Sequence, residues 1–153
     1  MHIWHDLPLG ENAPDELTAV IEIPKGSHNK YEVDKETGLI KLDRVLWTAN
    51  FYPFDYGFFP QTLWEDGDPL DVIVVATNPF VPGCLVDVRP VGVMRMVDSG
   101  ESDDKIIAVP TKDPRWEEVK SIDDIAEHQK KEWQQMFETM KTLQGKKVEV
   151  KAD

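Results

Sequence analysis

The chain has 153 residues, of which 41% are hydrophobic and 30% are charged, the balance of an ordinary globular protein. Its net charge of −12 argues against nucleic acid or an anionic membrane as a partner, because both are bound through a basic face. Cys84 is the single cysteine, which excludes an internal disulfide and favours a reducing compartment. No apolar run approaches the roughly 18 residues of a membrane span, and the first residues lack the basic and apolar stretches of a signal peptide. We therefore expect a cytoplasmic protein.

Short strands are predicted for most of the chain after a polar entry segment, residues 1–16. Six segments show an alternating pattern or a short apolar run bounded by turn residues: 17–23, 30–33, 39–42, 71–75, 85–97 and 105–109. The turn at 34–38 joins the second and third of these, as in a hairpin. Pro90 and Gly92 interrupt the longest segment, so we expect that strand to be bent.

The periodicity changes to that of a helix after residue 120. Residues 121–124 are typical of a helix start, and Gly145 is placed to end the helix. Between them, apolar side chains recur at helical spacing at Trp133, Met136, Phe137, Met140 and Leu143. Many short strands with one late amphipathic helix predict an α+β fold built on a small closed β-barrel. The expected parts of a single domain over 1–153 are an entry segment at 1–16, mainly β-barrel at 17–120, a helical part at 121–145 and a closing strand at 146–150.

The most distinctive motif is the acidic hexapeptide Asp-Gly-Asp-Pro-Leu-Asp at 66–71. Two carboxylates about 4 Å apart repel each other by roughly 4 kcal/mol at an effective dielectric near 20. Asp66, Asp68 and Asp71 therefore need a compensating cation, unless the segment is simply a solvated loop. An EF-hand calcium loop is excluded, because its twelfth position would be Thr77 rather than glutamate. A phosphotransfer aspartate normally follows an apolar strand, which the preceding residues do not form. The remaining interpretation is a site for Mg²⁺ or Mn²⁺.

A second acidic segment covers residues 98–105 and is, by itself, best explained as a hairpin turn. The functional interpretation places Asp98 and Asp103 beside the first acidic cluster, with Lys105 supplying a positive charge. That interpretation depends on the fold bringing the two loops together.

Further candidates for a ligand site are cations and tyrosines. Lys30, Arg44 and Lys141 would each, if taken alone, be interpreted as surface residues, although an arginine directly after a strand suits bidentate phosphate recognition. Most rings of the aromatic segment 50–60 are expected in the core, while two of its residues, Tyr52 and Tyr56, can present hydroxyls to a ligand.

Taken together, these segments resemble the family I soluble inorganic pyrophosphatases of the prokaryotic type. Residues 66–72 resemble the signature of that family. Other segments match it in order and spacing: Glu22-Ile-Pro, Lys30-Tyr-Glu-Val-Asp34, Leu42-Asp-Arg44, Tyr52-Pro with Tyr56-Gly57, Arg89-Pro-Val-Gly92, Asp98 to Lys105, and Val109-Pro110. The resemblance covers about residues 18–150. It implies a five-stranded OB-like closed β-barrel with helices, and Mg²⁺-dependent hydrolysis of pyrophosphate to two phosphates.

The resemblance also implies a role for each candidate. The implied metal ligands are Asp66, Asp71, Asp98 and Asp103, with Glu32 and Glu22 as further acidic residues that act on the metals or through waters. Asp68 is implied as the general base that takes a proton from a water bridging two metal ions. The implied substrate contacts are Lys30, Arg44, Tyr52, Tyr56, Lys105 and Lys141. The implied cofactor is Mg²⁺ or a similar ion such as Mn²⁺, and the implied assembly is a homohexamer.

One departure from the family pattern is visible, and two other functions stay open. A tyrosine usually precedes the last lysine of the family's phosphate site, and here that pair is Met140-Lys141. A non-catalytic module that stores or senses divalent metal would share the acidic residues but would not need the ordered cations and tyrosines. A metal-dependent hydrolase of nucleotides or phosphomonoesters would need a recognition pocket for which no separate motif is present.

Overall fold

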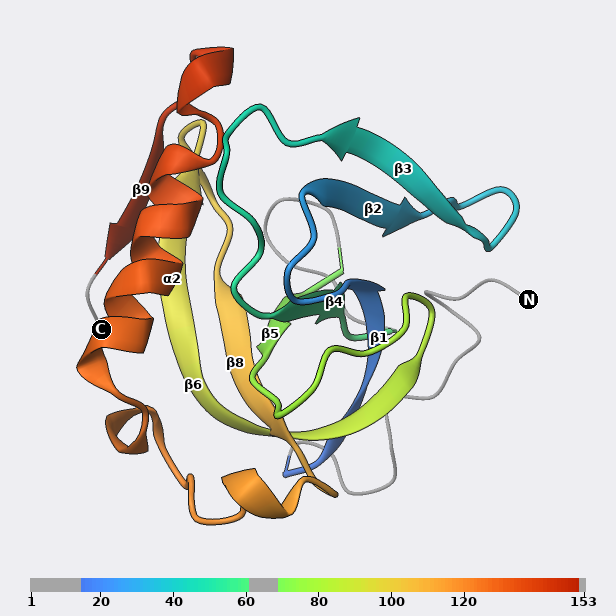
Figure 1. The fold of residues 1–153 in the computed structure, drawn as a ribbon, viewed down its shortest axis with the longest axis vertical. Helices are drawn as coiled ribbons and strands as arrows, with labels where there is room; N and C mark the ends of the chain where they lie inside the picture. The colour runs from blue at the N-terminus through green and yellow to red at the C-terminus, as the bar shows by residue number, and fades with distance from the viewer. Residues whose placement is uncertain (1–14, 61–68, 152–153) are drawn as a thin grey trace.

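The fold was obtained as a computed structural model that describes residues 15–60 and 69–151, and this part of the chain is mostly β-structure with one α-helix (Figure 1). The strands are β1 (Leu17–Ile23), β2 (Asn29–Val33), β3 (Ile40–Val45), β4 (Asp55–Phe58), β5 (Asp71–Val74), β6 (Leu85–Asp98), β7 (Glu101–Ser102), β8 (Lys105–Pro110) and β9 (Val148–Lys151). The helix is α2 (Glu127–Thr139), and three 3₁₀ turns are η1 (Pro114–Trp116), η2 (Ile122–Asp124) and η3 (Thr142–Gln144). None of the helices in these residues is long and apolar enough to cross a membrane.

The main sheet is built around the long curved strand β6, which sweeps across the lower half of Figure 1. The strands of the main sheet follow the order β1-β4-β5-β8-β6, and β1 pairs with β6 as well as with β4. The β5–β8 pair is parallel and the other pairs are antiparallel. The register of β6 against β8 shifts between Pro90 and Gly92, which confirms the bend expected from those two residues. The expected combination of many strands with one late helix is likewise confirmed.

The predicted hairpin is present as a separate two-stranded sheet, β2–β3, which lies above the main sheet in Figure 1. Lys30 is opposite Arg44, and Tyr31 is opposite Leu42, so Asp43 has no partner of its own on β2. This bulge turns the Asp43 side chain toward the two neighbouring cations.

Strand β4 was not predicted, because all four of its residues are buried and the segment therefore shows no alternation. Gly57 lies where β4 crosses β1 most closely. A Cβ atom at this position would stand 1.9 Å from the carbonyl oxygen of Val20, so no other residue fits without separating the strands. The close crossing fixes Tyr56, the residue before Gly57, against the main sheet.

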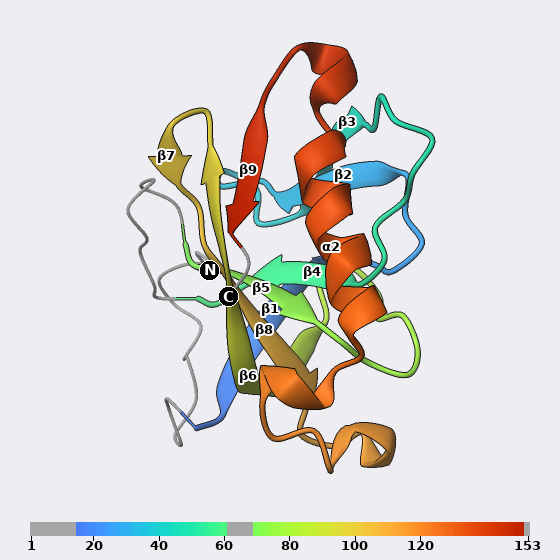
Figure 2. The same ribbon diagram turned by 90° about the vertical axis from the view of Figure 1, so that its left-hand side faces the viewer.

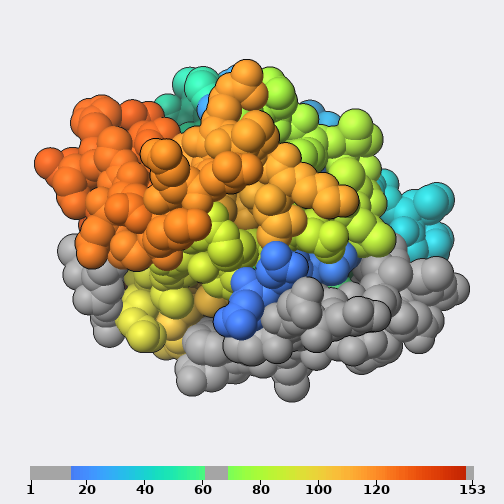
Figure 3. Space-filling model, turned by 90° about the horizontal axis from the view of Figure 1, so that it is seen from below, coloured from blue at the N-terminus to red at the C-terminus, as the bar shows by residue number. Residues whose placement is uncertain are grey.

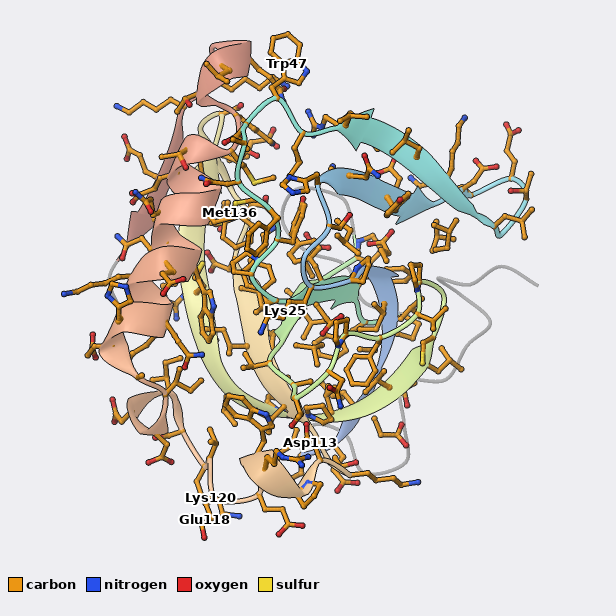
Figure 4. The ribbon with its side chains drawn as sticks, viewed as in Figure 1. Lys25, Trp47, Asp113, Glu118, Lys120 and Met136 are labelled. Atoms are coloured by element: carbon orange, nitrogen blue, oxygen red, sulfur yellow. The ribbon has the colours of Figure 1, made fainter. Side chains whose placement is uncertain are left out.

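Helix α2 covers one face of the main sheet and runs beside β9, as Figures 1 and 2 both show. Its buried residues are Trp133, Met136 and Phe137, and the inward position of Met136 can be followed in Figure 4. Phe137 stacks on Phe54 with ring centroids 5.5 Å apart. The helix ends at Thr139, earlier than the periodicity predicted, and the chain continues into η3.

On the underside of the molecule (Figure 3), the segment that carries η1 and η2 covers the sheet beside β6. Arg89 of β6 anchors this segment by donating hydrogen bonds to the carbonyl oxygens of Val119 (2.6 Å) and Trp116 (3.3 Å). Ser121 and Asp124 form a capping box around η2. These contacts hold the connection to α2 at the end of the molecule opposite the hairpin β2–β3 (Figure 1).

Candidate active site

A cleft of about 940 Å³ opens between the hairpin β2–β3, the main sheet and the C-terminal end of α2. Ten of the predicted site residues line it: Glu22, Lys30, Glu32, Tyr52, Tyr56, Asp71, Asp98, Asp103, Lys105 and Lys141. Arg44 stands beside the cleft, opposite Lys30 on the hairpin. Asp66 and Asp68 lie outside the described residues. The fold therefore brings together the two acidic segments and the candidate cations, which the sequence interpretation required.

The inner wall of the cleft consists of Tyr56, Asp71, Asp103 and Lys105. The adjacent strands β4, β5 and β8 bring these side chains together. Asp71 of β5 is paired with Phe58 of β4 on one side and with Lys105 of β8 on the other. Lys105 Nζ donates to Asp71 Oδ2 at 2.8 Å and to Asp103 Oδ1 at 2.7 Å. The Tyr56 hydroxyl donates to the same Asp71 Oδ2 at 2.9 Å. The Lys105 side chain is only 3% exposed, whereas those of Asp71 and Asp103 are 25% and 19% exposed, so the ammonium group is shielded from water and the carboxylates open to the cleft.

Burial and charge act against each other in this wall. Burial lowers the pKa of Lys105, but the carboxylates of Asp71 and Asp103 outweigh it and raise that pKa overall, so the ammonium stays charged. Burial and the nearby carboxylates raise the pKa of Tyr56 well above its usual value, so its hydroxyl remains a neutral donor.

The hairpin wall of the cleft consists of Lys30, Glu32, Asp43 and Arg44. Asp43 Oδ2 lies 3.4 Å from Lys30 Nζ and 3.2 Å from Arg44 Nε. Arg44 Nη1 also donates to Gln144 Oε1 of η3 at 3.1 Å. Arg44 Nε is buried and, within the described residues, its N–H points at no acceptor, although Asp43 is close enough for an ion pair. The partly exposed Arg44 guanidinium group and the Lys30 ammonium group suit an anion.

Asp43 was missed as a site residue by the sequence interpretation. The available signal was its place between the leucine and arginine of Leu42-Asp-Arg44, but the bulge that aims its carboxylate at both cations cannot be read from that triplet. Sequence reasoning also gave no role to Gln144, which contacts Arg44 from a distant part of the chain.

The C-terminal end of α2 closes the third side of the cleft. Lys141 Nζ donates to Asp98 Oδ2 at 2.6 Å. Burial raises the pKa of Asp98, but Lys141 outweighs it and the pKa is lowered overall. Met140 is buried, as its place on the apolar stripe predicted, and it also lines the cleft beside Lys141.

Two groups lie at the floor of the cleft, the half-buried Glu22 and the buried Tyr52. Burial raises the pKa of Glu22 to about 8, with a further rise from the charges of Asp71 and Glu32, while a hydrogen bond from the Val33 amide opposes it. The Tyr52 ring is buried against Phe54 and Tyr56, and burial raises the pKa of its hydroxyl. Acidic side chains outnumber basic ones among the described residues that line the cleft.

The donor set fits a hard divalent cation. Asp71, Asp98 and Asp103 offer carboxylate oxygens, the ligands that Mg²⁺ prefers. Within the described residues no three acidic, histidine or cysteine side chains converge on one point. Instead, the ammonium groups of Lys105 and Lys141 hold these carboxylates. Burial is the main reason for the raised pKa of Glu22, and the charges of Asp71 and Glu32 add to it; a bound cation would offset this smaller, electrostatic part.

Comparisons with known proteins agree on one family. The model of the inorganic pyrophosphatase family matches residues 19–153. An inorganic pyrophosphatase of Geobacillus stearothermophilus is 56% identical over 134 residues, covering 88% of this chain and 81% of the relative. A soluble inorganic pyrophosphatase of Oryza sativa is 50% identical over 149 residues, covering 97% of this chain and 70% of the relative. Among solved structures, the inorganic pyrophosphatase from Thermus thermophilus superposes with a TM-score of 0.95 at 48% identity, covering 99% of this chain and 88% of that one.

Proposed function

This chain belongs to the inorganic pyrophosphatase family, and on that premise we propose that it hydrolyses pyrophosphate to two phosphates in the cleft described above. The observation that carries the proposal is the meeting of two kinds of group in one cleft. Carboxylates come from β5, β6 and the turn before β8, and cations come from the hairpin, β8 and the end of α2. Pyrophosphate is strongly anionic, so a protein of net charge −12 needs such local cations to bind it.

We assign substrate binding first to Lys30, Arg44 and Lys141. Lys30 and Arg44 face each other across the hairpin, and their side chains are 27% and 25% exposed, so both charged groups can contact a phosphoryl oxygen. Lys141 follows the end of α2 and donates to Asp98. Lys105, Tyr56 and Tyr52 are proposed to contact the phosphoryl oxygens nearest the inner wall. Together these cations hold the two phosphoryl groups and neutralise the charge that develops as the bridging bond breaks.

We propose Mg²⁺, or a similar ion such as Mn²⁺, as the cofactor. Asp71, Asp98 and Asp103 would hold it, with Asp66 and Glu32 completing the set. When bound, such an ion lowers the pKa of a coordinated water toward neutrality and stabilises charge on the phosphoryl oxygens. The lysines that hold these carboxylates keep the acidic wall in place and partly neutralised.

We assign Asp68 as the general base, which accepts a proton from the attacking water. It follows Asp66 by two residues and precedes Asp71 by three, so it belongs to the segment that leads into the inner wall. A carboxylate that accepts a proton in the transition state contributes typically 10²–10⁴-fold to the rate. Asp68→Asn is therefore expected to retain most metal affinity and to lose about 10²-fold or more in kcat. Calorimetric titration with Mg²⁺ checks the first part, and equal loss of metal binding in Asp68→Asn and Asp71→Ala would contradict the assignment.

Release of phosphate from three substrates tests the proposed function against its alternatives. We expect release from pyrophosphate with Mg²⁺, none with excess EDTA, and little from ATP or a phosphomonoester. Preference for ATP or the monoester would favour a broader phosphohydrolase. Metal binding without any phosphate release would favour a module that stores or senses metal. Full activity in EDTA would remove the metal from the mechanism.

Finer points of architecture and setting are proposed on the same premise. The pairing of β1 with both β4 and β6 supports a five-stranded OB-like closed barrel made of β1, β4, β5, β8 and β6 within a single domain. Exposed apolar side chains, among them Trp47 and Val45 beside the hairpin, support assembly into a homo-oligomer, for which we propose a hexamer. Sedimentation analysis would test the assembly. The proposed location remains the cytoplasm.

A further inference from the structure

Strand β2 has two edges, and one of them faces β1 instead of a strand partner. Across the hairpin, the Asp34 amide donates to the Leu39 carbonyl at 2.8 Å. The Val33 amide, one residue earlier, points the opposite way, because successive amides of a strand alternate in direction. It donates to the carboxylate of Glu22, with Val33 N 2.8 Å from Glu22 Oε2. A side chain of the main sheet thus takes the place of a strand partner for β2.

A bulge in β1 gives Glu22 the reach for this contact. Ile21 pairs with Gly57 and Ile23 pairs with Tyr56, so Glu22 has no residue of its own opposite it on β4. Ile21 and Ile23 are almost fully buried in the main sheet. A bulge re-aims the side chain of its extra residue. The Glu22 side chain is therefore directed out of the main sheet and onto the edge of β2.

The contact matters because a two-stranded sheet is marginally stable by itself. Beneath the hairpin, Val33 packs in a small buried cluster with Val20 and Phe58. At its far end, Arg44 bonds to Gln144. The Glu22–Val33 hydrogen bond adds a polar link from β1, near the cleft-lining residues of β2.

We infer that Glu22 is a positioning residue, whose carboxylate holds the Val33 amide and thereby fixes β2 with Lys30 and Glu32 at the cleft. This role replaces direct metal ligation as the main task of Glu22. The importance of placing Lys30 rests on the proposed function, whereas the bond itself does not. The inference deepens the account of substrate binding, because Lys30 contacts the substrate and Glu22 acts through it.

Two conservative variants separate positioning from metal ligation. Glu22→Gln keeps the side-chain length and an acceptor oxygen for the Val33 amide but cannot ionise. Glu22→Asp keeps a carboxyl group but is shorter by one methylene, so it cannot reach the amide without movement of the strand. Positioning predicts that Gln replaces Glu22 better than Asp does. Metal ligation predicts the reverse order.

The direct readout is hydrogen–deuterium exchange at the Val33 amide, measured by mass spectrometry without Mg²⁺ or substrate. We expect exchange in Glu22→Gln within about 3-fold of the unaltered protein, and exchange about 10-fold faster or more in Glu22→Asp and Glu22→Ala, the scale of one lost hydrogen bond. Thr18→Val is the matched control, because it removes an exposed hydrogen bond to Asp87 from the same strand. It should leave Val33 exchange unchanged.

Kinetics and metal titration complete the test. We expect the KM for pyrophosphate to rise in Glu22→Asp and Glu22→Ala more than kcat falls, with Glu22→Gln close to the unaltered protein in KM and in Mg²⁺ affinity. Unchanged Val33 exchange in all variants, or a Gln variant that loses Mg²⁺ while the Asp variant retains it, would overturn the inference. If Glu22→Ala fails to fold, the comparison of Glu22→Gln with Glu22→Asp in Val33 exchange and in KM still decides between positioning and metal ligation. Absence of pyrophosphate hydrolysis in the unaltered protein would instead overturn the proposed function, and the exchange order would still test the bond.

Discussion

The two walls of the cleft both pair lysines with aspartates, but they differ in how far the lysine side chain is exposed to water. On the inner wall, Lys105 is 3% exposed and bonds at 2.8 and 2.7 Å to Asp71 and Asp103, whose side chains are 25% and 19% exposed. On the hairpin wall, the side chains of Lys30 and Asp43 are 27% and 30% exposed, and their charged atoms are 3.4 Å apart. A buried cation is costly to leave without its partners, whereas a pair in which both groups are open to water contributes little to stability. The inner wall is therefore fixed by the fold, and the hairpin wall keeps its cations available to an anion.

The largest expected effect is that of Asp71→Ala on the inner wall. The change leaves Lys105 with one carboxylate instead of two and the Tyr56 hydroxyl without its acceptor. Breaking a fully buried pair from one side costs about 3–5 kcal/mol. Because Asp71 is partly exposed and Lys105 keeps Asp103 as a partner, we expect a loss at or somewhat below the lower end of that range in the free energy of unfolding in urea. Phosphate release from pyrophosphate should be abolished, because a proposed metal ligand is lost as well.

Asp87→Ala is the control for this variant, since Asp87 is exposed and accepts a hydrogen bond from Thr18, its register partner on the neighbouring strand β1. It should change the free energy of unfolding by less than about 0.5 kcal/mol. If Asp71→Ala changes the free energy of unfolding by a similarly small amount, the inner wall is not more strongly held than the hairpin wall and the comparison is wrong.

A smaller and different effect is expected for Lys30→Met on the hairpin wall. Because the Lys30–Asp43 pair is long and open to water, the free energy of unfolding should change by less than about 1 kcal/mol. The KM for pyrophosphate should rise about 10-fold or more, since a charge-assisted contact to the substrate is lost. Steady-state kinetics and urea unfolding of the same preparation check both parts. Destabilisation as large as that of Asp71→Ala would show that the hairpin wall is part of the structural framework.

The smallest effect is expected for Met140→Tyr, at the end of α2. Met140 lines the cleft beside Lys141, so a tyrosine there supplies the hydroxyl that methionine lacks. We expect a decrease in KM or a gain in kcat/KM of up to about 10-fold, the scale of one hydrogen bond to a charged group. Lys141→Met should impair the enzyme far more. Unchanged kinetics in Met140→Tyr would mean that position 140 does not face the substrate.

Local patterns were sufficient to predict most of the elements. The alternation in 17–23 and the turn before 39–42 correspond to β1 and to the hairpin, and Pro90 and Gly92 marked the bend in β6. Strand β4 was missed because it is buried on both faces, which leaves no alternation to detect. The predicted helix was longer than α2 because the apolar spacing continues to Leu143. In the structure the chain has already left the helix at Lys141, which pairs with Asp98.

The candidate site was predictable in its residue types but not in its contacts. Spacing could suggest that the two acidic segments meet, yet only the parallel pairing of β5 with β8 places Lys105 beside Asp71. The contacts of Glu22 with Val33 and of Asp43 with its two cations depend on bulges, which shift register by one residue and leave little trace in sequence. The positions of Asp66 and Asp68 stay predictions of the sequence, since they lie outside the described residues.

A crystal structure with Mg²⁺ and imidodiphosphate, whose P–N–P bridge stands in for the bridging oxygen of pyrophosphate, tests the central claim most directly. The account predicts both phosphoryl groups inside the cleft, with one in contact with Lys30 and Arg44, and metal ions bound by Asp71, Asp98 and Asp103. It also predicts that the Glu22 carboxylate still accepts from the Val33 amide. Phosphoryl groups bound outside the cleft, or ions that do not contact these three aspartates, would contradict it.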